Sequence, residues 1–120
     1  MNFEHFPTDS LWRHRLPFGA GEVQICGLSE RPTEEQKRLL ALFLPLLPAL
    51  TKEALQRLSP PEGFFKSDLP EELELYEMRF ESSGDVELFF EPSLEIDGYD
   101  ACPMATCSAA GQLLSVCWTV

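Results

Sequence analysis

Cysteine and histidine are the first side chains in this chain that could carry out chemistry. Cys102 and Cys107 are separated by four residues, and His5 and His14 lie far upstream. A zinc site is normally built from two close pairs of ligands, and the sequence offers one loose pair without a matching second. We therefore predict no metal site, and we interpret the thiols as small side chains buried in strands.

Nucleophilic and acid–base catalysis are also poorly supported. A cysteine nucleophile needs an electropositive surrounding that lowers the thiol pKa, whereas Cys102 and Cys107 follow a run of carboxylates. A glycosidase pair needs one carboxyl in a partly apolar cleft, and "EIDGYDA" (95–101) lacks the alternating oxygen ligands of a calcium loop. We predict no catalytic residue and no cofactor, and the chain is not expected to be an enzyme. A small hydrolase that uses the 92–107 loop is the alternative.

The carboxylates are strongly concentrated. From Asp68 to Asp100 there are twelve acids and one base, Arg79, so this segment carries a charge of −11, which equals the formal net charge of the whole chain. Such a field repels phosphates, so neither nucleic acid nor an anionic membrane is an expected partner. A basic protein surface is the natural complement.

The centre of the acidic segment, "RFESSGDVELFF" (79–90), predicts a tight hairpin. If Phe80 opposes Val86, the loop is Ser-Ser-Gly with glycine at the left-handed position. The same register sets Met78 against Leu88, and it sets Tyr76 against Phe90. A bulge or strand start is expected near residue 75. The outer face of this hairpin is then Glu77, Arg79, Glu81, Asp85, Glu87, Phe89 and Glu91.

This outer face is the candidate partner-binding site. Glu77, Arg79, Glu87 and Glu91 would orient a basic partner, and Phe89, an aromatic ring among charges, would anchor it. Two alternatives remain open. The carboxylates could simply keep the wet side of a half-buried sheet soluble, and another part of the chain could cover Phe89.

The order of elements predicts the fold class. The chain of 120 residues, 44% of them hydrophobic, is expected to be a single domain over 1–120. Strands are predicted over about 10–28 and 72–120, with a helical region over about 33–58 and a loop over 92–103. The prediction is an α+β fold, in which one long or kinked helix packs on one face of an antiparallel sheet of about five to six strands.

The helix has a clear start and an ambiguous middle. Thr33 and Gln36 have the spacing of a capping box. Pro45 and Pro48 each remove a backbone donor, so we expect a kink or a split, with a second piece over about 51–58. The apolar stretch "LLALFLPLLPAL" (39–50) has twelve residues, which is short for a bilayer and suitable for a core helix.

No signal peptide is apparent, and a cytoplasmic protein with reduced thiols is expected.

Five stretches carry a resemblance when they are taken together: "LWRHRLPFGAGEVQI", "TEEQKRLLALFLPLLPALTKEAL", "LELYEMRF", "VELFFEP" and "GQLLSVCWTV". Their pattern of strands and helix resembles a group of small bacterial proteins of unknown function, many of them thought to be immunity proteins of polymorphic toxin systems. The resemblance implies a protein that binds and neutralises a cognate toxin domain, such as a basic nuclease, and it implies no catalytic residue.

A secretion chaperone is the alternative from another functional class. Such chaperones are also small, acidic and α+β, and they hold an unfolded effector segment as a homodimer. The apolar helix would then form a dimer face. The sequence leaves open whether the protein is a monomer or a homodimer.

Overall fold

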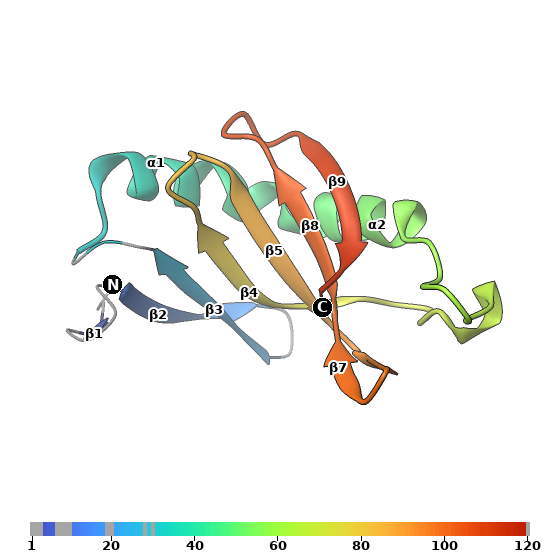
Figure 1. Cartoon of the computed structure of the whole chain (residues 1–120). Coiled ribbons are helices and arrows are strands. Elements are labelled where there is room, and N and C mark those ends of the chain that lie inside the picture. The colour runs from blue at the N-terminus through green and yellow to red at the C-terminus, as the bar shows by residue number, and fades with distance from the viewer. Residues whose placement is uncertain (1–3, 7–10, 19–20, 28, 30, 120) are drawn as a thin grey trace.

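Nine strands and one long helical run appear in the structure, a computed structural model that describes residues 4–6, 11–18, 21–27, 29 and 31–119 (Figure 1). The strands are β1 Glu4–Phe6, β2 Leu11–Phe18, β3 Gly21–Gly27, β4 Glu74–Phe80, β5 Val86–Glu91, β6 Leu94–Ile96, β7 Tyr99–Ala101, β8 Pro103–Cys107 and β9 Leu113–Trp118. The helices are α1 Glu34–Phe43, η1 Leu44–Leu46, α2 Leu47–Arg57 and η2 Lys66–Asp68.

The predicted α+β class is confirmed. The main sheet has seven strands in the order β1-β2-β3-β4-β5-β8-β9, and β6 and β7 form a separate two-stranded ribbon. The strand β1 was not predicted, and it makes β2 an inner strand. The expected strand start at Ser10, the expected turn at 19–20 and the end of the last strand at Val120 lie outside the described residues.

The main sheet is mixed rather than wholly antiparallel. β3 and β4 pair in parallel, with Ile25 opposite Met78, whereas the other neighbouring strands pair antiparallel. The helical run connects β3 to β4, so the chain returns across one face of the sheet and enters β4 at the end where β3 began. Parallel neighbours require such a crossover. Strand order along the sequence did not reveal that the two connected strands would be neighbours.

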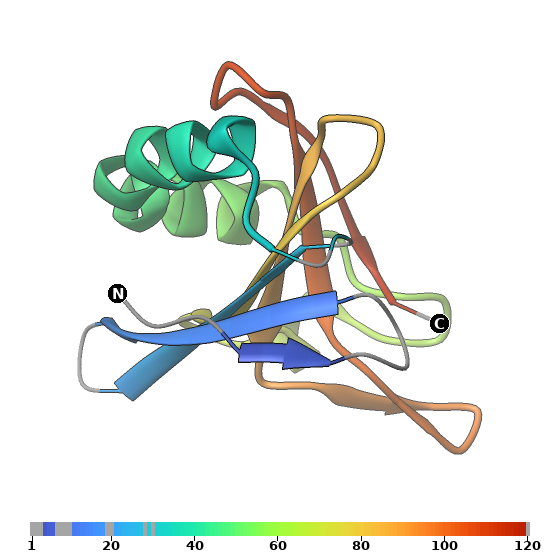
Figure 2. The same ribbon diagram turned by 90° about the vertical axis from the view of Figure 1, so that its left-hand side faces the viewer.

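The run of α1, η1 and α2 covers one face of the sheet, and among the described residues no α-helix lies on the other face (Figure 2). Six helix residues are buried against the strands: Leu39, Leu40, Phe43, Leu47, Leu50 and Ala54. Their strand partners in the core include Val23, Ile25, Met78, Phe80, Val86, Leu88 and Phe90. Each large side chain removed from water in this layer contributes about 1.5–3 kcal/mol. The apolar face is broad because Leu42, Leu44 and Leu46 are only partly buried and pack at the margin of the core. The exposed side of the helices carries small residues and prolines, such as Ala41 and Pro45, together with charged residues.

The N-terminus of α1 is fixed by the predicted capping box. The Gln36 backbone N–H donates to Thr33 Oγ1 at 3.0 Å, and the Thr33 N–H donates to Gln36 Oε1 at 2.9 Å. The indole Nε1 of Trp12 donates to the same Gln36 oxygen at 2.9 Å. One side chain therefore caps the helix and ties it to β2.

The two prolines change the helix type without splitting the run. A 3-10 turn, η1, follows α1, and α2 begins directly after it at Leu47 rather than at about residue 51 as expected. Pro45 and Pro48 each stand at one of the first two positions of a new element, where proline is well tolerated. The tighter turn thus accommodates both prolines.

The run Glu34–Arg57 has 24 residues and is long and apolar enough, by length and composition, to cross a membrane. The apolar stretch 39–50 is only part of this run, because the helix continues through both prolines. The core helix of a soluble protein passes the same test. In this structure the run forms the helix layer of the core, with Phe43 and Leu47 fully buried.

The β4–β5 hairpin has the predicted register except at its open end. Phe80 opposes Val86, Met78 opposes Leu88, and Gly84 has the left-handed φ of 92°. The predicted bulge is present between Leu75 and Glu77. It sets Leu75 opposite Phe90, so the predicted pairing of Tyr76 with Phe90 is wrong.

The segment 92–103 was predicted as a loop, and this prediction is also wrong. It contains the β6–β7 ribbon, which projects on the side of the sheet away from the helices (Figure 2). Asp97 and Gly98 form its turn with φ values of 49° and 83°. Asp-Gly with positive φ at both positions is the preferred two-residue hairpin turn, so the sequence contained the signal for this hairpin.

Candidate functional site

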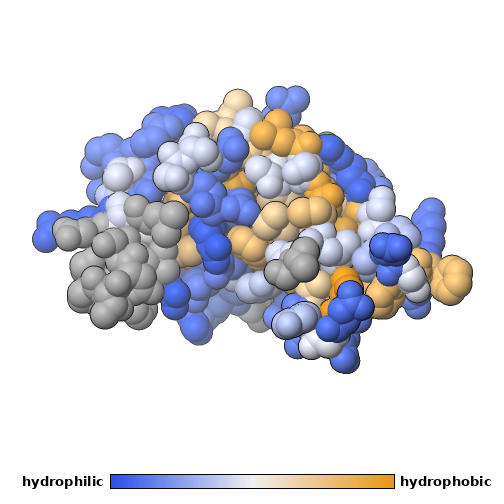
Figure 3. Space-filling model, in the orientation of Figure 1, coloured by the Kyte–Doolittle hydropathy of each residue, from blue (hydrophilic) through white to orange (hydrophobic). Residues whose placement is uncertain are grey.

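Four of the five predicted site residues lie on the helix-free face of the sheet. Alternation along β4 and β5 turns Glu77, Arg79, Glu87 and Phe89 away from the helices, and Glu77 opposes Phe89 while Arg79 opposes Glu87. Figure 3 views this face and shows hydrophilic colouring over the β4–β5 hairpin and apolar colouring over β8 and β9. The predicted acidic surface is therefore confined to part of the face.

Glu77 and Arg79 are engaged with each other. Arg79 Nη2 donates to Glu77 Oε2 at 2.6 Å, and the Glu77 side chain is only 12% exposed. The other carboxylate oxygen, Oε1, accepts from Gln24 Nε2 of β3 at 2.9 Å. Both Glu77 oxygens are thus occupied, and this residue contributes more to holding β3 against β4 than to an open charged surface.

Phe89 is not an exposed anchor. The residue is only 8% exposed, the Arg79 guanidinium lies 4.8 Å from its ring centroid, and the Tyr76 ring lies 6.4 Å away. On its other side Phe89 pairs with Met104 of β8. Arg79 and Tyr76 lie against a ring that is almost wholly buried, so the interpretation of Phe89 as a solvent-facing hot spot is wrong.

Glu87 belongs to an acidic cluster near the tip of the hairpin. Its pKa is raised to about 7, first by a hydrogen bond shared with the Glu81 carboxyl, then by partial burial and by the negative charge of Glu81. Arg79 opposes this shift, and Asp85 adds to it. A proton is therefore held at this cluster near neutral pH, which makes the centre of the predicted face less negative than a count of its carboxylates indicates.

Glu91, the fifth predicted residue, lies elsewhere. It is exposed at the end of β5, directly opposite Glu74 of β4. Both residues line an open groove of about 690 Å³ where β3 and β4 begin, β5 ends and α2 passes over the sheet. We call it the acidic groove. Its lining residues are Phe18, Gly21, Glu22, Pro48, Thr51, Lys52, Leu55, Glu71, Glu72, Leu73, Glu74, Leu75, Tyr76 and Glu91.

The acidic groove combines charge and apolar surface. Five exposed glutamates, Glu22, Glu71, Glu72, Glu74 and Glu91, face a single lysine, Lys52, so the lining carries a net charge of five minus one, or four negative charges. Beneath them lie apolar side chains, among them the half-buried Phe18 and Leu55 and the buried Leu73 and Leu75. A smaller hollow of about 280 Å³, lined by Arg15, Glu22, Gln24, Tyr76 and Glu77, shares Glu22 and Tyr76 with the groove.

Most of the groove was missed from the sequence. The run "PEELELYE" (70–77) carries four glutamates before and within β4, and this charge run was a usable signal. Glu22 is about fifty residues earlier in the chain, and the parallel pairing of β3 with β4 brings it to the same end of the sheet. That pairing was not expected, so no feature of the sequence alone indicated that Glu22 and the 71–77 glutamates would meet.

Thiol and metal chemistry find no support in the described residues. All four cysteines are free thiols. Burial raises the pKa of Cys26 and raises that of Cys107 to about 12, which is the opposite of what a nucleophile needs. Within the part of the chain that the structure describes, no three His, Cys, Asp or Glu residues are close enough together to hold a metal ion.

Comparisons with known proteins give no relative. The chain matches no protein-family model, no curated protein and no solved structure.

Proposed function

We propose that this protein is a non-enzymatic acidic binding protein of the immunity type, which acts in the bacterial cytoplasm and neutralises a basic toxin domain, such as a nuclease, by direct binding. The observation that carries the proposal is the uncompensated negative charge of residues 68–100. Its single base, Arg79, is already paired with Glu77. The remaining carboxylates of this segment therefore have no basic residue of their own segment to neutralise them.

An uncompensated field of this kind acts mainly on association. It steers a basic protein toward the acidic surface and can raise the association rate by ten to a thousandfold at low salt. It also repels phosphate groups, which is consistent with a protein rather than a nucleic acid as the partner. The buried and raised-pKa thiols add no catalytic group to this surface.

The helical run offers no exposed apolar face of the kind that the chaperone alternative requires. Among the described residues, the large hydrophobic side chains that are well exposed are Phe65, Tyr99 and Leu114, and none of them belongs to the helical run. The leucines that suggested a dimer face, such as Leu47 and Leu50, are buried against the sheet. We therefore retain the immunity-type function as the single proposal.

The test is capture of the partner followed by kinetics. The tagged protein is used as bait in lysate of its source, the bound protein is identified, and its association with the pure chain is measured at rising salt. We expect one basic protein, with an association rate that falls by about tenfold or more between low and high salt. A partner that is not basic, or a rate that does not respond to salt, would contradict the proposal.

A further inference from the structure

We propose that the acidic groove binds an extended peptide segment in which lysine or arginine alternates with apolar residues. This inference rests on the proposed function and names the part of a basic partner that would be recognised, together with the surface that recognises it.

The floor of the acidic groove fits apolar side chains. Phe18 and Leu55 are only partly buried, and they line the groove together with the buried Leu73 and Leu75. A volume of about 690 Å³ is within the range of sites that take a ligand of several side chains. Apolar groups that settle on this floor would leave water at about 25 cal/mol for each Å² buried.

The rim selects the charge of the occupant. Glu22 comes from β3, Glu74 from β4 and Glu91 from β5, so the carboxylates approach the groove from separate strands. An anionic ligand would be repelled. A purely apolar ligand would desolvate carboxylates without pairing them, which is costly. A ligand with spaced cationic groups avoids both penalties.

A metal ion is not the complement of this rim. The described residues contain no cluster of three acidic, histidine or cysteine side chains that could coordinate one ion. Separated carboxylates suit separated ammonium or guanidinium groups instead. Lysine and arginine also carry apolar stems that can lie along a floor while the charged head stays near water.

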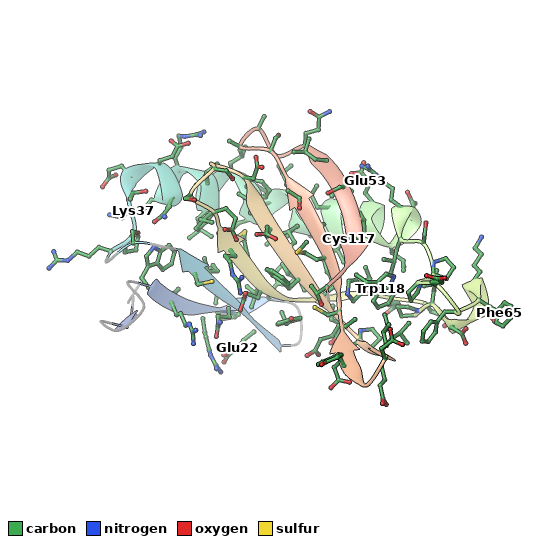
Figure 4. The ribbon with its side chains drawn as sticks, viewed as in Figure 1. Glu22, Lys37, Glu53, Phe65, Cys117 and Trp118 are labelled. Atoms are coloured by element: carbon green, nitrogen blue, oxygen red, sulfur yellow. The ribbon has the colours of Figure 1, made fainter. Side chains whose placement is uncertain are left out.

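The shape of the site favours an extended chain over a compact amine. The second hollow shares Glu22 and Tyr76 with the groove, and Arg15, Gln24 and Glu77 complete its lining. Two adjacent hollows at the end of the sheet where β3 and β4 begin offer successive places for side chains that follow one another along an extended chain. Figure 4 shows Glu22 at this end of the sheet, far from Lys37 near the start of α1.

The test uses short blocked peptides and NMR of the ¹⁵N-labelled full chain. The probe is Lys-Leu-Lys-Leu-Lys, and the comparisons are Lys-Ser-Lys-Ser-Lys and Glu-Leu-Glu-Leu-Glu. We expect the probe to shift the amide signals of Glu22, Thr51, Lys52, Leu73 and Tyr76. Loss of the leucines should weaken binding by about tenfold, since burial of apolar groups is lost, and the acidic peptide should not bind.

Matched variants locate the site. Glu74→Gln with Glu91→Gln removes a cross-strand acidic pair in the groove, whereas Glu95→Gln with Asp100→Asn removes a cross-strand acidic pair in the β6–β7 ribbon. Both double variants change the net charge by the same amount. We expect about tenfold weaker peptide binding for the groove variant and less than twofold change for the ribbon variant.

The outcomes separate this inference from the proposed function. Equal weakening by both double variants, or probe shifts confined to residues 81–87, would overturn the groove as the site. Absence of any binding by the probe would overturn it as well. If a captured basic partner keeps its salt-dependent association with the Glu74→Gln, Glu91→Gln variant, the proposed function stands and the groove fails. If no basic partner exists, the proposed function fails whatever the peptide does.

Discussion

Glu74 and Glu91 lie directly opposite each other across β4 and β5, and both are exposed. Like charges in this position destabilise a sheet. Arg79 and Glu87 face each other further along the same strands, and this pair combines a basic with an acidic side chain. The acidic pair therefore costs stability at the rim of the acidic groove.

Reversing one charge of this pair should stabilise the fold and impair binding. Glu91→Lys converts a like pair into an opposite pair, so we expect the free energy of unfolding to rise by about 0.5 kcal/mol. Binding of the Lys-Leu probe should weaken by more than tenfold. Urea unfolding and peptide titration measure the two effects.

The control for this reversal is Glu95→Lys, which faces Asp100 in the β6–β7 ribbon. It makes the same change in net charge and also creates an opposite pair. Peptide affinity should stay within about twofold of the wild-type value. A loss of stability in Glu91→Lys, or equal loss of binding in both variants, would count against this account of the groove.

The proton held near Glu87 should appear in the pH dependence of stability. The folded-state pKa is about 7, above the ordinary 4.5, so the folded chain holds the proton more tightly than the unfolded chain. The resulting stabilisation is fully present below about pH 4.5 and is lost as the pH rises through 7. Glu87→Gln should therefore be more stable than wild type at pH 8, by about 1 kcal/mol after solvent screening.

Urea midpoints at pH 4.5, 6 and 8 measure this difference. The advantage of Glu87→Gln over wild type should shrink as the pH falls, because the wild-type carboxyl then becomes protonated. A constant difference between Glu87→Gln and wild type from pH 4.5 to 8 would mean that Glu87 titrates in its ordinary range.

Gly27 should be intolerant of a side chain. A Cβ at this position would lie 2.6 Å from Trp12 Nε1 and 2.9 Å from Gln36 Nε2, against the contact that ties α1 to β2. Gly27→Ala should lower the free energy of unfolding by about 2 kcal/mol, because it overpacks this junction. Thermal unfolding followed by tryptophan fluorescence measures the loss. Gly21→Ala, which would meet nothing within 4 Å, should be close to neutral, and equal effects of both variants would refute the close approach.

The four thiols should differ in reactivity. Cys117 is exposed, whereas Cys26 and Cys107 are buried and have raised pKa values. At pH 8 a thiol reagent should label Cys117 first and leave the two buried thiols unlabelled until urea is added. Cys117→Ser should remove the fast phase. Fast labelling of Cys107 in the folded protein would contradict its position in the core.

The sequence by itself determined the features that depend on neighbours along the chain. The capping box at Thr33 and Gln36 and the Gly84 hairpin follow from local hydrogen bonds and from backbone conformations that few residues adopt. The alternation that turns Glu77 and Glu87 to one face follows from the two-residue period of a strand. The Asp97-Gly98 turn is also a local signal, because Asp-Gly favours a hairpin turn with positive φ, although the segment 92–103 was interpreted as a loop.

Tertiary structure alone decided which distant residues meet. The crossover that sets β3 beside β4 brings Glu22 to the glutamates around Glu74, and β8 beside β5 brings Met104 against Phe89. Burial of Phe89 and assembly of the acidic groove are consequences of strand order. Strand order depends on how the helix layer and the whole sheet bury apolar area together, and no short stretch of sequence carries that information.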